Sequence, residues 1–119
     1  MAATFLTNSL SCCACSYTRF PVAGKVKPQF KQTFLDHMAE LSAIVRQEQG
    51  CISYQQNISV DEPLTLFLYE QWQSQALLNA HLASSHMQQH LKQARPWFDW
   101  VEMKTFEAQV FDLMESNHE

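Results

Sequence analysis

The stretch from Leu64 to Trp72 restricts the fold more than any other part of this sequence, because it is apolar on both sides of an extended chain. In a strand, the leucines at alternate positions would line one face, and Phe67 and Tyr69 would line the other. A strand that is apolar on both faces is expected to be buried on both. The segment therefore predicts a sheet with helices on one face and a second cover on the other.

Strand and helix patterns precede this segment. The β-forming residues from Leu10 to Phe20 predict a strand, and Pro21, Gly24 and Pro28 predict a loop after it. Apolar residues then recur every three or four positions, which predicts an amphipathic helix of about five turns. These apolar positions are Phe30, Phe34, Met38, Leu41 and Val45. We expect the helix to begin at Pro28 and to end in a left-handed cap at Gly50.

Turn and capping residues divide the rest of the chain. The remaining predicted elements are a strand over residues 51–58, a turn over residues 60–63, a short helix from an N-cap at Ser74 to Leu82, a second helix from Ser84 to about Arg95, and a strand from about Glu102 to Leu113. Serine suits an N-cap because its hydroxyl accepts a hydrogen bond from the first turn. Pro96 stops the second helix because its ring cannot continue it.

The order of these elements is strand, helix, strand, strand, helix, strand. It predicts an α+β fold of the ferredoxin-like split βαβ type, with an antiparallel sheet and helices on one face. The 119 residues make a single domain, with residues 1–9 and 115–119 expected to be frayed. The cover that Leu64–Trp72 requires on the other face of the sheet predicts a homodimer.

Composition excludes several classes of function. The net charge is −4 and no two basic residues are adjacent, so neither nucleic acid nor an anionic membrane surface is an expected partner. Only Gly24 and Gly50 are glycines, so the glycine-rich loops that hold nicotinamide, flavin or nucleoside triphosphates cannot be built. We therefore expect no cofactor, and in an oxidising enzyme the substrate itself would supply the electrons.

The N-terminal segment and the cysteines indicate the compartment. No apolar run approaches the ~20 residues of a membrane helix, and residues 1–10 lack the basic and long apolar parts of a secretory signal. Cys12, Cys13, Cys15 and Cys51 are expected to be free thiols in a reducing environment. Both observations favour a cytoplasmic protein.

His81, Glu70 and Trp72 are the residues that could carry chemistry. The imidazole of His81 can take and return a proton near neutral pH, although its position also fits a core histidine. Glu70 and Trp72 share one face of a strand. Trp72 could stack on an aromatic substrate, and Glu70 could orient an imidazole or accept a substrate hydroxyl. The alternative is that Trp72 is core and Glu70 pairs with backbone or arginine groups.

Other polar and aromatic residues could complete a pocket. His86 and His90 lie four residues apart, a spacing seen in metal sites, but Ser84 and Ser85 interrupt the helix between them and His81. No fourth ligand is evident, so we predict no metal site and take His90 as a solvated residue. The possible pocket contacts are Tyr54, Tyr69 and Met87. The aromatic residues Trp97, Phe98 and Trp100 would form a lid or a dimer seam.

Two ordered motifs resemble the antibiotic biosynthesis monooxygenase family, and its quinol monooxygenase branch most closely. They are residues 47–54 (Gln-Glu-Gln-Gly-Cys-Ile-Ser-Tyr) and the run from Glu70 to Met87. The resemblance implies the ferredoxin-like fold and dimers that are called α/β barrels. It places His81 at the family's Ala-His position and His86 at its His-Met position, lining the pocket. The haem-degrading branch, which has Trp where His81 stands, fits poorly.

The resemblance favours a catalytic His81 and implies a cofactor-independent monooxygenase or quinol oxidase. The substrate would be a hydroquinone or phenolic aromatic molecule. His81 would remove a hydroxyl proton, and the resulting anion would give an electron to O2. Two alternatives stay open: a non-oxidative isomerase of a small signal molecule that uses His81 and Glu70, and a non-catalytic stress protein that binds an aromatic ligand.

Overall fold

The computed structural model of the protein describes residues 15–109, with side chains from Val22 onward. Its elements are, in chain order, β1 (Cys15–Val26), the 3-10 helix η1 (Pro28–Phe30), α2 (Lys31–Val45), β2 (Cys51–Ile58), β3 (Thr65–Trp72), α3 (Gln75–Ala83), α4 (Ser85–Ala94), the 3-10 helix η2 (Arg95–Trp97), β4 (Phe98–Met103) and β5 (Phe106–Gln109). Among the described helices, none is long and apolar enough to cross a membrane.

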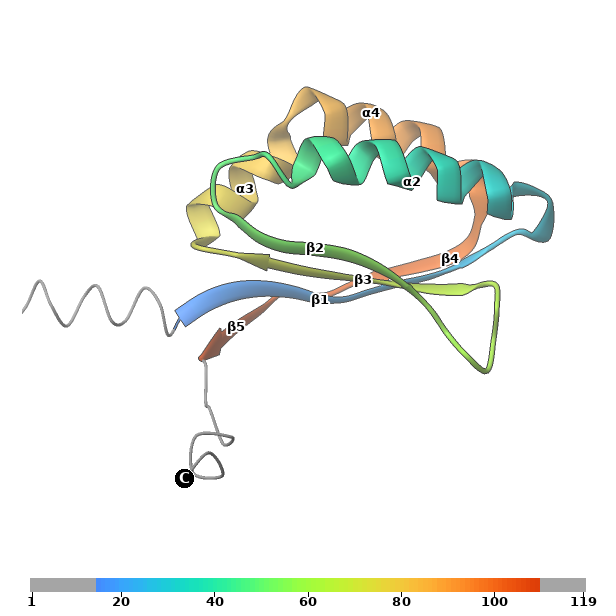
Figure 1. The fold of residues 1–119 in the computed structure, drawn as a ribbon, viewed down its shortest axis with the longest axis horizontal. Coiled ribbons are helices and arrows are strands. Elements are labelled where there is room, and N and C mark those ends of the chain that lie inside the picture. Colours follow the sequence, from blue (N-terminus) through green and yellow to red (C-terminus); the bar gives the residue numbers. More distant parts are fainter. Residues whose placement is uncertain (1–14, 110–119) are drawn as a thin grey trace, which may run out of the picture.

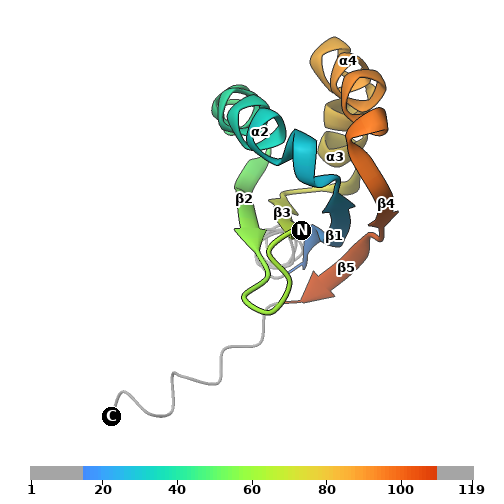
Figure 2. The same cartoon turned by 90° about the vertical axis from the view of Figure 1, so that its right-hand side faces the viewer.

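The strands form one antiparallel sheet in the order β2-β3-β1-β4, and β5 pairs with the first residues of β1. All three α-helices lie on one face of this sheet (Figures 1 and 2). The arrangement confirms the predicted α+β, ferredoxin-like fold. On the face of β3 away from the helices, Phe67 and Tyr69 are partly exposed in the single chain.

The predicted periodicity of α2 is confirmed by the residues that it buries. Phe34, Met38, Leu41 and Val45 are all buried against the sheet. The helix ends at Val45, however, and not at Gly50 as predicted. Gly50 instead adopts φ 89° in the turn directly before β2, where a Cβ atom would lie 2.5 Å from Cδ1 of Leu77. Its left-handed backbone and close packing therefore place α3 against this turn.

Two serines set the boundaries of α3 and α4 as predicted. The hydroxyl of Ser74 accepts a hydrogen bond from the backbone N–H of Leu77 at 3.2 Å. The hydroxyl of Ser84 accepts one from the N–H of Met87 at 3.4 Å, so that a new helix begins after a one-residue interruption. The break turns the chain between His81 and His86, which directs both side chains toward the turn after α2.

The predicted loop at Pro21 and Gly24 is wrong, because β1 continues through both residues to Val26. The pairing of β1 with β3 shifts register between Arg19 and Val22, and such a bulge accommodates a proline that cannot donate to the ladder. At Gly24, a Cβ atom would lie 2.8 Å from Cε1 of Phe98. Here glycine permits close packing and not a turn. The predicted strand residues before Cys15 lie outside the described residues.

The last predicted strand begins too late and is divided in two. β4 starts at Phe98, directly after η2, and β5 follows a break at Lys104 and Thr105. Phe98 pairs with Val26 of β1 and packs edge-on against Phe34, with ring centroids 5.0 Å apart. These contacts hold the aromatic segment in the sheet, where the sequence predicted a connection. The predicted residues beyond 109 lie outside the described part.

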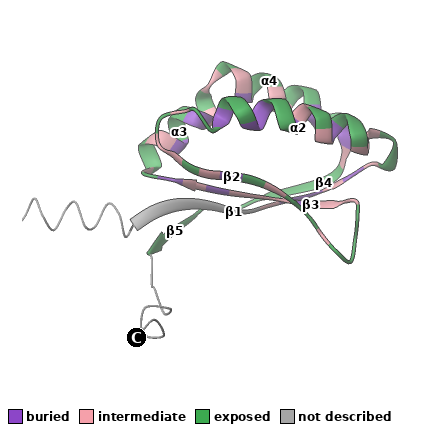
Figure 3. Ribbon diagram, in the orientation of Figure 1, coloured by how far each residue is buried: buried purple, intermediate pink, exposed green. Residues whose placement is uncertain are grey.

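The core lies between the helices and the sheet, as the buried segments in Figure 3 show. Its fully buried centre contains Val26, Val45, Trp72 and Leu78. Trp97 closes the far end of the core by packing against Phe30 and Phe34. Trp100, in contrast, is 45% exposed on β4.

Candidate functional site

A cavity of about 490 Å³ lies between the sheet and the helices α2 and α4. Most of its wall is apolar. The apolar side chains that line it include Phe34, Met38, Leu66, Leu68, Met87, Leu91 and Phe98. The polar side chains in its wall are those of Tyr54, Gln56, Glu70, His90, Arg95 and Asp99. An apolar cavity of this size with a few polar groups is typical of a site for a small organic molecule.

Glu70 is a fully buried carboxylate in this wall. Strand alternation places it on the same face of β3 as Trp72, as predicted, and the indole Nε1–H of Trp72 donates to its Oε1 at 3.0 Å. The same oxygen lies 3.6 Å from Nε2 of His81. A carboxylate held in this way is fixed in position where it meets the cavity.

His81 lies behind Glu70 and does not line the cavity. It is 1% exposed, and its ring lies over Trp72 with centroids 4.5 Å apart and beside Tyr54 at 5.9 Å. Nδ1 lies 3.1 and 3.2 Å from the two carboxylate oxygens of Glu48. Because a carboxylate only accepts, Nδ1 carries the hydrogen of this bond, and Nε2 is directed to Glu70.

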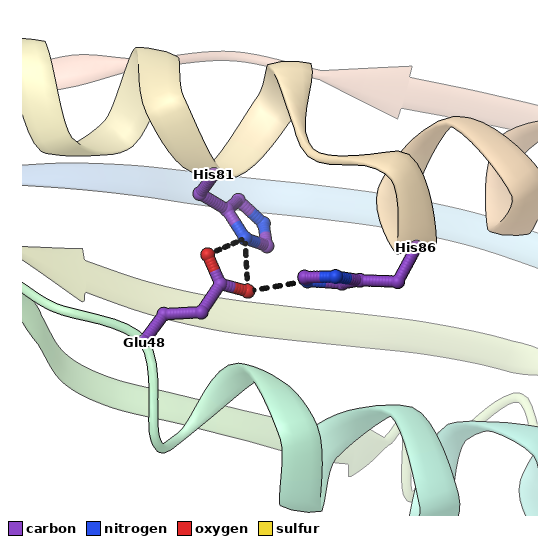
Figure 4. Close-up of side chains that lie close together, drawn as sticks. All are labelled: Glu48, His81 and His86. Atoms are coloured by element: carbon purple, nitrogen blue, oxygen red, sulfur yellow. Dashed lines mark hydrogen bonds and ion pairs between the residues drawn. The ribbon is translucent and has the colours of Figure 1, made fainter.

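Glu48 joins His81 to His86 (Figure 4). It lies in the turn between α2 and β2, and its Oε2 accepts a hydrogen bond from Nε2 of His86 at 2.7 Å. The hydroxyl of Ser84 lies 3.2 Å from the same nitrogen. One ligand atom from each of Glu48, His81 and His86 lies within 4.8 Å of the others. Glu48 was not predicted as a site residue, although it lies inside one of the two motifs that carry the family resemblance.

The structure brings together some of the predicted site residues and separates others. Glu70, Tyr54 and Met87 all line the cavity. The predicted substrate contacts Trp72 and His86 do not line it, since Trp72 is fully buried against His81 and Glu70 and His86 binds Glu48. Tyr69 points to the opposite face of β3, where its hydroxyl donates to Gln71.

The prediction that His90 is solvated is wrong. Its Nδ1 lies 2.9 Å from Nε2 of His37, and the two rings stack with centroids 5.0 Å apart. His90 also lines the cavity. The residue therefore has a fixed position in the wall, because α4 packs beside α2 at this point.

Two further polar groups lie near Glu70. Nε2 of Gln56 is buried in the cavity wall and has no hydrogen-bond partner among the described residues, so it offers a donor to a bound molecule. Cys51 is the first residue of β2, three residues after Glu48. Burial raises the pKa of its thiol, and the charges of Glu70 and Glu48 raise it further, while Arg46 lowers it. The thiol is thus held in its protonated form.

A family described as antibiotic biosynthesis monooxygenase has a model that matches residues 23–93, a span that contains the cavity helices and the Glu48, Glu70 and His81 cluster. No curated protein matches the chain in sequence.

Several solved structures share the fold. A conserved protein from Methanosarcina mazei has a TM-score of 0.76 at 20% identity, over 85% of this chain and 99% of its own. A Deinococcus radiodurans protein, provisionally named an antibiotic biosynthesis monooxygenase, has a TM-score of 0.76 at 16% identity, over 83% and 98%. A Mycobacterium tuberculosis protein has a TM-score of 0.74 at 20% identity, over 82% and 98%. At these identities the likeness shows the fold alone.

Proposed function

This chain belongs to the antibiotic biosynthesis monooxygenase family, and we propose that it is a cofactor-independent enzyme that oxidises a hydroquinone or phenolic aromatic substrate with O2. The position of Glu70 carries this proposal. Its carboxylate lines an apolar cavity of about 490 Å³ and lies 3.6 Å from Nε2 of His81. A proton acceptor thus stands where the hydroxyl of a bound aromatic molecule would lie.

In the proposed reaction, Glu70 and His81 act as one general base. Glu70 accepts the hydrogen bond from the substrate hydroxyl, and the proton is shared with Nε2 of His81 behind it. Glu48 holds His81 through Nδ1, which leaves Nε2 as the basic atom. The resulting anion gives one electron to O2. The radical pair then recombines to a hydroperoxide at a ring C–H carbon, which takes back the proton held by the base and loses water to leave a carbonyl. Alternatively, a second electron and proton pass from the semiquinone to superoxide and the base returns its proton, which gives the quinone and hydrogen peroxide.

The cavity wall suits a planar substrate with two oxygens. Leu66, Leu68 and Met87 supply apolar surface that excludes water, and the phenol ring of Tyr54 lies beside Glu70 in the wall. Gln56 offers its amide N–H to a second substrate oxygen. In this proposal Trp72 and His86 do not contact the substrate. Trp72 orients Glu70 and His86 orients Glu48 through their hydrogen bonds, and Tyr69 has no role.

We also propose that the protein works as a homodimer. The side chains of Trp100, Val101 and Met103 are about half exposed and also line the cavity, so they form its rim. Exposed apolar side chains at one edge mark an interaction surface. A second copy that packs on the open face of the sheet, where Phe67 and Tyr69 are partly exposed, and also covers this rim would close the cavity and exclude water from the reaction. Light scattering on the purified chain tests this, and a monomer at micromolar concentration would contradict it.

Oxygen uptake by metal-stripped protein with a reduced naphthoquinone tests the proposed chemistry. We expect uptake above the autoxidation of the substrate, unchanged by a chelator, and reduced about 10²–10⁴-fold in His81→Ala, which is the usual cost of losing a general base. Circular dichroism confirms that the variant is folded. Uptake that is equal in a folded His81→Ala protein would refute the role of His81.

The two alternative functions predict other outcomes of the same experiment. An isomerase would give no oxygen uptake with the naphthoquinone and would turn over its own substrate in the absence of O2, with the same dependence on His81. A binding protein would give a saturable complex with the naphthoquinone and no uptake in any variant. Either result would overturn the oxidase proposal.

A further inference from the structure

We propose that Glu48, His81 and His86 form a binding site for a divalent transition-metal cation of the zinc type. One ligand atom from each residue lies within 4.8 Å of the other two (Figure 4). Two imidazoles and one carboxylate are a ligand set that zinc uses when it keeps a further position for water. The proposal goes beyond the oxidation described above, which makes no use of a cation at this position.

The three side chains already converge on one point. Oε2 of Glu48 lies 3.1 Å from Nδ1 of His81 and 2.7 Å from Nε2 of His86. Zinc bonds of about 2.0–2.1 Å hold tetrahedral ligand atoms about 3.3 Å apart, so the cluster needs a modest adjustment. The side chains of Glu48 and His86 are 19% and 29% exposed and have room to move, whereas His81 is fixed.

The surroundings of His81 resemble the outer shell of a zinc ligand. A histidine that binds zinc through one ring nitrogen usually has a carboxylate at the other, which orients the ring and increases its basicity. Here Nδ1 faces the cluster and Nε2 lies 3.6 Å from Oε1 of Glu70. The indole of Trp72 in turn holds Glu70.

The local charge also favours a cation. Within residues 22–109, the ion pairs of Glu48 are with His81 and His86, and none is with a lysine or an arginine. Glu70 adds a second carboxylate on the far side of the imidazole. A cation would replace the hydrogens on Nδ1 of His81 and Nε2 of His86. In each neutral imidazole the hydrogen then lies on the other ring nitrogen, and because the imidazolium form cannot bind the cation, binding weakens at low pH. In His81 the hydrogen lies on Nε2, toward Glu70, so the cation-loaded protein lacks the base of the proposed oxidation.

The cation site and the cavity lie on opposite sides of His81. None of the three ligand residues lines the cavity, and the exposed atoms of Glu48 and His86 give access from solvent. Metal binding can therefore be measured without substrate and without reference to turnover.

Calorimetric titration of the metal-free protein with Zn²⁺ tests the site. Cys12, Cys13 and Cys15 are replaced by serine in every protein compared, because thiolates also bind zinc. We expect one Zn²⁺ per chain, and affinity at least about 10-fold lower in Glu48→Gln and in His86→Gln, the smallest loss usual even for outer-shell partners. His90→Gln is the matched control, since His90 lies one turn further along α4 and should leave the affinity unchanged.

Titration with Co²⁺ gives a second readout, because a four-coordinate cobalt site has strong visible absorption that a loosely bound ion lacks. We expect this absorption in the parent protein and in His90→Gln, and its loss in His86→Gln. No stoichiometric Zn²⁺ binding would overturn the proposal. Equal affinity in the parent, Glu48→Gln and His86→Gln proteins would also overturn it, since the ion would then be held elsewhere.

Discussion

The space between the helices and the sheet is closed at one end and open at the other, although strand β3 forms the floor of both. At the closed end, Trp72, Leu78 and His81 are at most 1% exposed, and the rings of Trp72 and His81 lie 4.5 Å apart. At the open end, Leu66 and Leu68 face a cavity of about 490 Å³. The eight residues of β3 thus border a tightly packed core at one end and the cavity at the other.

The difference shows how the molecule separates proton transfer from substrate binding. The closed end holds two histidines and Glu48 in a hydrogen-bonded cluster, in which His81 is buried. The open end offers apolar surface with few polar groups. Glu70 belongs to both, because its carboxylate contacts Trp72 on one side and lines the cavity on the other, and Tyr54 likewise lines the cavity and lies beside His81. Fixed polar groups beside an apolar cavity need little reorganisation during a reaction.

The largest expected effect comes from changing the residue that joins the two ends. Glu70→Gln keeps the shape of the side chain and an oxygen for the indole of Trp72, but it removes the carboxylate. If Glu70 accepts the substrate proton, oxygen uptake with a reduced naphthoquinone should fall about 10²–10⁴-fold. Glu62→Gln, in the exposed turn before β3, is the control and should match the parent protein. Equal rates in the two variants would remove Glu70 from the mechanism.

A pair of leucine truncations tests whether one end is packed and the other open. Leu78→Ala leaves a void in the closed end and should lower the free energy of unfolding by about 2–5 kcal/mol. Leu68→Ala should cost less, because its side chain already borders the cavity. Urea denaturation at equal protein concentration measures both. A loss for Leu68→Ala that equals or exceeds the loss for Leu78→Ala would show that the cavity is filled in solution.

Local sequence signals predicted the elements that form the closed end. The capping serines Ser74 and Ser84 fixed both short helices, and strand alternation placed Glu70 and Trp72 on one face. These features depend on neighbours a few residues apart, which a sequence pattern records directly. The same rules failed at Pro21 and Gly24, because long-range pairing with β3 and β4 overrides their preference for turns.

The contacts that define the site depend on residues far apart in the chain. Glu48 meets His81 and His86 across 33 and 38 positions, and it lies in a turn without periodicity. The stacking of His90 on His37 spans 53 positions and was likewise not predicted. A cavity has no sequence signature of its own, because it is the volume that many side chains leave unfilled. The residue types were therefore predictable, whereas their grouping was not.

A smaller effect is expected at the polar wall of the open end. Gln56→Leu removes the buried amide N–H that we assign to a second substrate oxygen, while it keeps a side chain of similar size. Loss of one hydrogen bond of about 0.5–1.5 kcal/mol should raise KM about 2- to 10-fold and change kcat little. Steady-state oxygen uptake measures both constants. An unchanged KM would indicate that the substrate does not reach Gln56.

The smallest effect is expected at Cys51, because the reactivity of its thiol depends on the nearby charges of Glu70 and Glu48. Its pKa is raised above the ordinary value by burial and by Glu70 and Glu48, so less thiolate is present at pH 8 than for an exposed cysteine. Because the thiolate is the reactive form, iodoacetamide should alkylate Cys51 slowly. Mass spectrometry measures the rate in a protein with Cys12, Cys13 and Cys15 replaced by serine.

Charge variants separate the electrostatic cause of this slow reaction from simple burial. Glu70→Gln removes a charge that raises the pKa of Cys51, so alkylation at pH 8 should become faster, whereas Arg46→Gln removes a charge that lowers the pKa and should make it slower. The protein unfolded in urea supplies the rate of an ordinary thiol. Equal rates in the parent, Glu70→Gln and Arg46→Gln proteins would show that burial alone slows the reaction of the thiol. The charge of Glu70 would then have no effect on the pKa of Cys51.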